Sequence, residues 1–170
     1  MSYSKPFRIQ TISELHRMRG LPQPEHPLIS VVDYAAMQPG EQMAVTLDFY
    51  SVERKRGVGK LFYGQQQYDF DEGVLYFLAP HQVLRSHPQA GAAEKRSGWI
   101  LYFHPDFIWN TPLATTIRQY EFFDYSVHEA LFLSQKEDLV TNGIIQNIQQ
   151  EYHSNIDKFS RDIIISQIQT

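Results

Sequence analysis

The chain has 170 residues, which is enough for one domain with a buried core. Fifteen basic against nineteen acidic residues give a net charge of −4, which argues against a segment that grips nucleic acid itself. There is no cysteine for a disulfide framework, and no apolar run approaches the ~20 residues that span a bilayer, so we expect a cytoplasmic protein without membrane contact.

The N-terminal part is predicted to be an arm, residues 1–27, because it holds four prolines. A short helical or irregular stretch is expected around Thr11–Met18. Pro27 then precedes Leu28–Tyr34, the first predicted strand, and a turn is expected at residues 38–40.

Every second residue over Met43–Tyr50 is a large apolar one (Met43, Val45, Leu47 and Phe49), which predicts one half-buried strand. The basic cluster at residues 54–56 follows and is interpreted as a solvated tip before a turn. More strands are predicted at Lys60–Tyr63, Gln65–Phe70, Val74–Leu78 and Gln82–Ser86, and a last one begins at Gly98 and breaks at His104-Pro105. Short strands bounded by glycine or proline are typical of an antiparallel sandwich or barrel.

Helices are predicted after Pro105: a helical turn at residues 106–109, a short helix at 112–121 and two longer helices. Ser134 and Glu137 match a capping box, and Asp157 caps the last helix. Gly143 costs about 1 kcal/mol relative to alanine inside a helix, so either packing requires it or the helix is weak there. The last helix is apolar nearly all round and lacks a stop signal at Thr170, so we expect more protein to follow.

The sequence shows no catalytic pattern. A metal-dependent barrel would need two or three histidines that converge with a carboxylate, and no His-x-His pair is present. His81, His87 and His104 leave a loose convergence open, although separate surface histidines are the simpler interpretation. There is no nucleophile elbow and no phosphate-binding loop. We therefore predict no catalytic residue, no metal and no cofactor.

A cavity among inward-pointing side chains is the remaining candidate site, because small barrels can hold one small ligand. On the last strand, Trp99 lies on one face while Tyr102 and His104 lie on the other, and the alternation leaves open which face is inside. The residues predicted to bind a ligand are Tyr50, Arg56, Tyr63, Tyr76, Trp99, Tyr102 and His104.

Five segments follow one another along the chain: residues 47–50, the RGVG turn from Arg56, DEGVLYFLAP at 71–80, GWILYFHPDFIWNTPL from Gly98, and EFFDY at 121–125 before two closing helices. Their order resembles that of the N-terminal sensory domain of AraC-type transcription regulators. The resemblance covers residues 28–170. It implies a cupin-like antiparallel β-barrel of the jelly-roll type, a two-helix antiparallel tail, a small effector in many members, helices that pair subunits, and a helix-turn-helix domain beyond residue 170.

We accordingly expect an arm at 1–27, a barrel at 28–105 and a helical dimerisation segment at 106–170. An effector in the barrel would shift how two DNA-binding domains are presented. The arm would act as a lid, with Phe7, Ile9 and Ile12 plugging the barrel mouth. A homodimer is predicted, with an interface at Ile144, Ile145, Ile148, Tyr152, Ile164 and Ile168.

Two other functions stay open at this point. One is a metal-dependent cupin enzyme, such as an isomerase or a dioxygenase, and the other is a free-standing binding or scaffold protein. The lack of a histidine-rich metal motif favours a protein that is not an enzyme.

Overall fold

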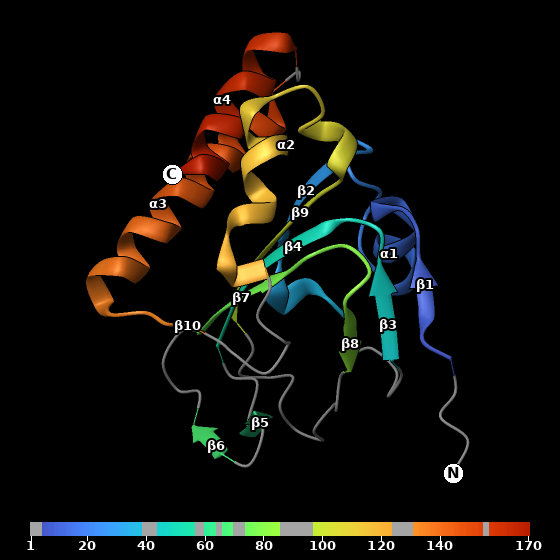
Figure 1. Cartoon of the computed structure of the whole chain (residues 1–170), viewed down its shortest axis with the longest axis vertical. Helices are drawn as coiled ribbons and strands as arrows, with labels where there is room; N and C mark the ends of the chain where they lie inside the picture. Colours follow the sequence, from blue (N-terminus) through green and yellow to red (C-terminus); the bar gives the residue numbers. More distant parts are fainter. Residues whose placement is uncertain are drawn as a thin grey trace.

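The structure, a computed structural model, describes residues 5–38, 44–56, 60–63, 66–69, 74–85, 97–123, 131–154 and 157–170. Strands make up most of the regular structure up to residue 103, and helices make up most of it afterwards. Figure 1 shows the long helices α3 (Gln135–His153) and α4 (Lys158–Gln169) packed together at one side of the strands. The predicted class, mainly β with C-terminal helices, is confirmed.

Hydrogen bonding arranges the described strands in three sheets. The largest has the order β10-β7-β4-β9-β2 and consists of β2 (Ile29–Asp33), β4 (Tyr50–Arg56), β7 (Val74–Leu78), β9 (Ser97–Phe103) and β10 (Leu131–Phe132). The second joins β1 (Phe7–Ile9), β3 (Ala44–Leu47) and β8 (Val83–Arg85), and the third pairs β5 (Lys60–Tyr63) with β6 (Gln66–Asp69). Strands distant in the sequence are neighbours, as in a jelly roll, and the described strands form separate sheets rather than a closed ring.

The single strand predicted over Met43–Tyr50 is wrong, because the chain changes sheets inside it. Strand β3 ends at Leu47, and β4 begins at Tyr50 in the largest sheet. At the corner, the Asp48 amide donates a hydrogen bond to the Ile9 carbonyl, and Phe49 is fully buried. The apolar residues still alternate across this corner, because Leu47 and Phe49 are buried in the same core although they lie on either side of it.

The largest sheet is buried on both faces, and strand β9 shows this most clearly. Trp99, Leu101 and Phe103 pack in a core shared with α3 and α4, which we call the helical core. Ile100 and Tyr102 pack in a second core with Phe49 and helix α1 (Ile12–Met18), which we call the inner core. The face of β9 that points into the β-structure is therefore that of Ile100 and Tyr102, which answers the question that the alternation leaves open.

The predicted arm is docked wherever the structure describes it. Strand β1 pairs in parallel with β3, and Ile9 and Ile12 are buried in the inner core. Phe7 is largely exposed. Two of the three residues predicted to plug the barrel mouth are therefore buried in the inner core and the third is not, and the role of the arm as a lid stays a prediction.

Buried His16 fixes helix α1 to the sheet. Its Nδ1 lies 2.6 Å from the Pro22 carbonyl oxygen, and its Nε2 lies 2.8 Å from the Ser30 hydroxyl. Burial lowers the pKa of His16, because the charged ring would lose its hydration. The neutral ring satisfies both partners, with Nδ1 donating and Nε2 accepting.

The helical part agrees with most of the predicted signals. The Ser134–Glu137 capping box is present, and Asp157 caps α4. Short helical segments follow β2 and β9: η1 (Tyr34–Ala36), η3 (Pro105–Phe107), α2 (Pro112–Thr116), η4 (Ile117–Gln119) and η5 (Glu121–Phe123). None of the helices within the described ranges combines the length and the apolar run needed to cross a membrane. The turn predicted at 38–40 lies largely outside the described residues.

Two glycines give opposite predictions for stability. A Cβ at Gly143 would meet nothing within 4 Å, so Gly143→Ala should raise the free energy of unfolding by about 1 kcal/mol through better helix propensity. Gly98 has a φ of +122° and a Cβ there would lie 1.9 Å from the Arg54 carbonyl oxygen, so Gly98→Ala should lower stability strongly. Urea denaturation measures both changes. A loss of stability in Gly143→Ala would contradict the open position of this residue on α3.

Candidate ligand-binding site

On strand β4, Glu53, Arg54 and Lys55 follow one another and point alternately to its two faces. The register pairs Glu53 with Tyr76 and Ile100, which places Glu53 on the inner face. Arg54 pairs with Leu75 and Trp99 on the helical face. The side chains of Glu53 and Arg54 are only 5% and 7% exposed. The interpretation of residues 54–56 as a solvated tip is therefore wrong for Arg54, because the strand continues through these residues between two packed layers.

On the inner face, Glu53 and Lys55 form an ion pair surrounded by polar and aromatic groups. Lys55 Nζ lies 2.7 Å from a Glu53 carboxylate oxygen, and the other oxygen accepts a hydrogen bond of 2.8 Å from the Ser51 hydroxyl. The same ammonium lies 4.8 Å from the ring centroid of Tyr34 and 5.8 Å from that of Tyr76. We call these five residues the inner polar cluster.

Tyr102 lies next to this cluster, where its hydroxyl stays protonated. Burial, helped by the negative charge of Glu53, raises the pKa of Tyr102 well above its usual value. Its ring packs edge-on against Phe49, with centroids 5.6 Å apart. The inner face thus combines one carboxylate, one ammonium and several phenol groups. Such a set can bind polar groups.

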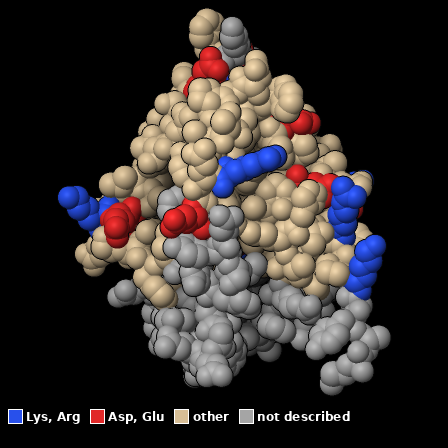
Figure 2. Space-filling model, viewed as in Figure 1, with Lys and Arg blue, Asp and Glu red and all other residues tan. Residues whose placement is uncertain are grey.

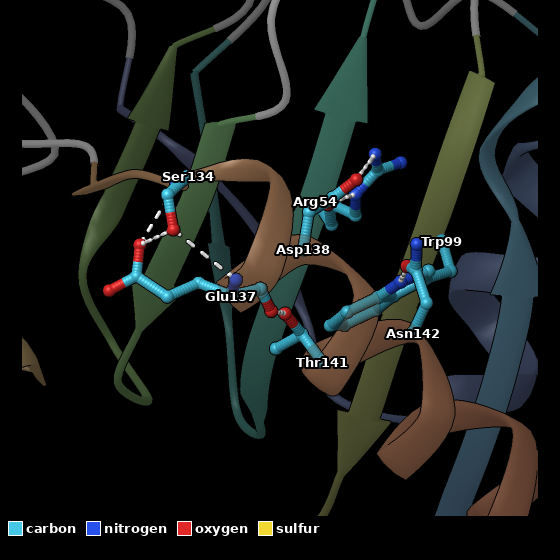
Figure 3. Close-up of polar contacts among 7 residues, drawn as sticks. All are labelled: Arg54, Trp99, Ser134, Glu137, Asp138, Thr141 and Asn142. Atoms are coloured by element: carbon cyan, nitrogen blue, oxygen red, sulfur yellow. Dashed lines mark hydrogen bonds and ion pairs between the residues drawn. The ribbon is translucent and has the colours of Figure 1, made fainter.

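On the helical face, β4 and β9 hold helix α3 through polar side chains (Figure 3). Arg54 donates two hydrogen bonds to the Asp138 carboxylate, one of them 2.7 Å long from Nη2 to Oδ2. Trp99 Nε1 donates to Asn142 Oδ1 at 2.9 Å. The capping box at Ser134 fixes the start of the same helix. The first half of α3 is therefore positioned by β9 and by β4, the strand that carries Glu53 and Lys55 of the inner polar cluster.

The predicted ligand-binding residues divide between the two faces. Tyr76 and Tyr102 lie on the inner face, and ligand contact stays a prediction for them. His104 lies just beyond the end of β9, where its Nδ1 accepts a hydrogen bond from the Asp106 amide. Tyr50 stacks on Phe103 in the helical core.

The other predicted contacts are placed as follows. Trp99 also lies on the helical face, so Tyr50 and Trp99 pack the helices instead of facing the inner polar cluster. This placement follows from the two-faced burial of β4 and β9, and ligand contact stays a prediction for Tyr50 and Trp99 as well. The side chains of Arg56 and Tyr63 lie outside the described ones.

The residues predicted for the dimer interface mostly belong to the chain's own core. Ile145, Ile148, Tyr152 and Ile164 are buried in the helical core, and Ile144 and Ile168 are partly buried against it. Their burial is explained by the sheet beneath, because the helices cover its outer face. The apolar side chains that the two helices leave exposed are Leu139, Val140, Phe159 and Ile163.

The histidines predicted as a loose metal site are only partly described. His81 Nδ1 lies 3.5 Å from a carboxylate oxygen of Asp48, and His104 also contributes to lowering the pKa of Asp48, although Arg8 is the main cause. His87 lies outside the described residues. Within the ranges that the structure describes, no group of three histidine or acidic residues could hold a metal ion.

A comparison with known protein families matched residues 55–167, more than half of the chain, to the AraC-like ligand binding domain. The chain belongs to this family. The resemblance to the N-terminal sensory domain of AraC-type regulators is therefore confirmed. Comparisons with curated proteins and with solved structures found no match. The matched range contains Lys55, Tyr76 and Tyr102 from the inner face of this AraC-like domain and nearly all of both long helices.

Sequence reasoning missed Tyr34, Ser51, Glu53 and Lys55 as members of the site. The sequence contains a pattern that indicates three of them, because Ser51, Glu53 and Lys55 occupy every second position of one strand and so share a face. The interpretation of the basic residues 54–56 as a surface turn hides this pattern. The contact between the Lys55 ammonium and the Glu53 carboxylate shows that at least these charges belong inside the protein.

The ion pair between Arg54 and Asp138 should be a main support of helix α3. Asp138→Asn leaves a guanidinium that is 7% exposed without its counter-charge, so we expect a loss of about 3–5 kcal/mol in the free energy of unfolding, measured by urea denaturation. Asp48→Asn is the matched control, since Asp48 is about as buried as Asp138 but pairs with Arg8, whose side chain is 59% exposed. Its effect should be much smaller. Equal losses would contradict the supporting role of the buried pair.

Proposed function

We propose that this AraC-like domain senses a small molecule on the inner face of its largest sheet and dimerises. In this proposal it is the non-enzymatic, regulatory part of a cytoplasmic transcription regulator that contacts DNA through a different domain. The observation that carries the proposal is the placement of Glu53 and Lys55 inside the β-structure of a ligand-binding family member, one residue on either side of the arginine that holds α3.

The inner polar cluster supports the sensing part. A buried carboxylate and a partly buried ammonium contribute little net stability, because desolvation offsets much of their attraction. They do provide donors and acceptors of defined direction, which is how a mostly apolar site selects a polar ligand. Tyr76 and Tyr102 add aromatic surface beside them.

The link between β4 and α3 supports the signalling part. A ligand that binds Glu53 or Lys55 would shift the population of β4 arrangements, and Arg54 would transmit this shift to Asp138. The C-terminal half of α3 would move less, because Ile145, Ile148 and Tyr152 are fully packed. The output would be a changed orientation of the first half of α3 relative to α4.

The charge distribution supports a division of labour with a separate DNA-binding domain. On the described part of the face in Figure 2, basic and acidic side chains are scattered rather than gathered in one basic patch. The net charge of −4 agrees with this view. Binding to phosphate groups requires clustered lysine and arginine.

Ligand sensing can be tested by thermal unfolding in a screen of small polar and aromatic compounds. We expect compounds that raise the melting temperature, with about 2.7 kcal/mol of stabilisation at a concentration 100 times the dissociation constant. Glu53→Gln should weaken their binding about ten-fold or more, because a charged hydrogen-bond partner is lost. Asp48→Asn, the same chemical change outside the cluster, should leave binding unchanged. A screen without any ligand, or ligands indifferent to Glu53→Gln, would contradict the proposal.

Dimerisation can be tested by sedimentation equilibrium. The exposed apolar residues are the candidates for a helix-to-helix contact between two copies, so Val140→Lys and Ile163→Lys should each weaken association about ten-fold or more. Gln146→Lys is the control, because it adds the same charge at an exposed polar position of α3. A monomeric wild-type chain, or an association unaffected by both lysines, would contradict this part of the proposal.

A further inference from the structure

The ammonium of Lys55 occupies a cage made by this chain's own side chains. The cage consists of the Glu53 carboxylate at 2.7 Å and the rings of Tyr34 and Tyr76, with centroids 4.8 and 5.8 Å away. A carboxylate combined with two aromatic rings within about 6 Å is an arrangement that binds organic cations. The Lys55 ammonium that fills this cage therefore indicates which kind of ligand group the cage can bind.

The walls of the cage are more deeply buried than its occupant. The Glu53 side chain is 5% exposed, whereas that of Lys55 is 18% exposed. Tyr34 and Tyr76 are 7% and 9% exposed. Ser51 holds the second oxygen of Glu53, so the carboxylate has a fixed direction. Lys55 has a flexible four-carbon stem near the end of β4, and it is the member that can leave with the least rearrangement.

The charges of the cage separate the possible classes of ligand. An anion that drew Lys55 away would leave Glu53 buried without a counter-charge, which is strongly unfavourable. A neutral ligand would lack the electrostatic attraction that the faces of the two rings exert on a cation. A cationic ligand can replace the Lys55 ammonium at Glu53 and between the rings, while Lys55 moves towards solvent and keeps its charge hydrated.

We infer that the effector of this domain carries an ammonium group, which takes the place of the Lys55 ammonium in the cage of Glu53, Tyr34 and Tyr76. This inference rests on the proposed sensing function and names its ligand class. Lys55 is then an internal competitor that keeps the cage filled until the effector arrives. Its departure changes the inner face of β4 directly beside Arg54, which holds helix α3.

Isothermal titration with three probes of the same carbon skeleton tests the inference: butylamine, 1-butanol and butyrate at neutral pH. Butylamine should bind the unmodified chain, and 1-butanol and butyrate should not. Lys55→Met should tighten butylamine binding about ten-fold or more, because a tethered competitor is removed. Glu53→Gln should remove the binding, while Asp48→Asn, which changes a carboxylate outside the cage, should leave it intact.

The outcomes distinguish the inference from the function on which it rests. If butylamine binds neither the unmodified chain nor Lys55→Met, or if its affinity is unchanged in Glu53→Gln, the cation cage is overturned. If 1-butanol or butyrate binds as tightly as butylamine and depends on Glu53, the ligand class is overturned and the sensing function stands. If Lys55→Met does not fold, Lys55→Gln replaces it, and the comparison of the three probes on the unmodified chain decides.

Discussion

Strand β4 lies between two apolar cores and carries Glu53, Arg54 and Lys55 in succession. Charged side chains of this one strand therefore point towards both cores. A strand in this position has no solvent-facing side, and each charge therefore needs a partner inside the protein. Glu53 and Lys55 pair with each other, and Arg54 pairs with Asp138 of α3. The docking of the helix and the chemistry of the inner face both follow from these two pairs. Gly98 of β9 permits the close approach of its backbone to the Arg54 carbonyl.

Much of the fold can be predicted from local patterns. Val74–Leu78 forms the predicted strand to the residue, and the capping box at Ser134 and the cap at Asp157 both begin their helices where expected. These features succeed because they depend on neighbours close in sequence. The predicted strand Met43–Tyr50 fails because periodicity records which side chains are buried, whereas the change of sheet at Asp48 depends on the distant Ile9.

The site was harder to predict for the same reason. Tyr50 and Trp99 are aromatic residues of predicted strands, as Tyr76 and Tyr102 are. They nevertheless lie on the opposite face of a sheet that is buried on both sides. Alternation assigns residues to faces but does not name the layer that covers each face. Likewise, Ile148 and Ile164 look like an interface on a helical wheel, and the structure shows that the partner surface is the chain's own sheet. Family membership supplied the general function, and only the register supplied the chemistry of the inner face.

The link from the inner face to helix α3 is the central claim, and amide hydrogen exchange along α3 in Lys55→Met tests it most directly. Removing the ammonium leaves Glu53 buried without its partner and disturbs β4, so amides of residues 135–142 should exchange faster, while those of residues 145–152, anchored by Ile145, Ile148 and Tyr152, should keep their protection. Faster exchange confined to the strands, with all of α3 unchanged, would show that β4 does not connect the two layers.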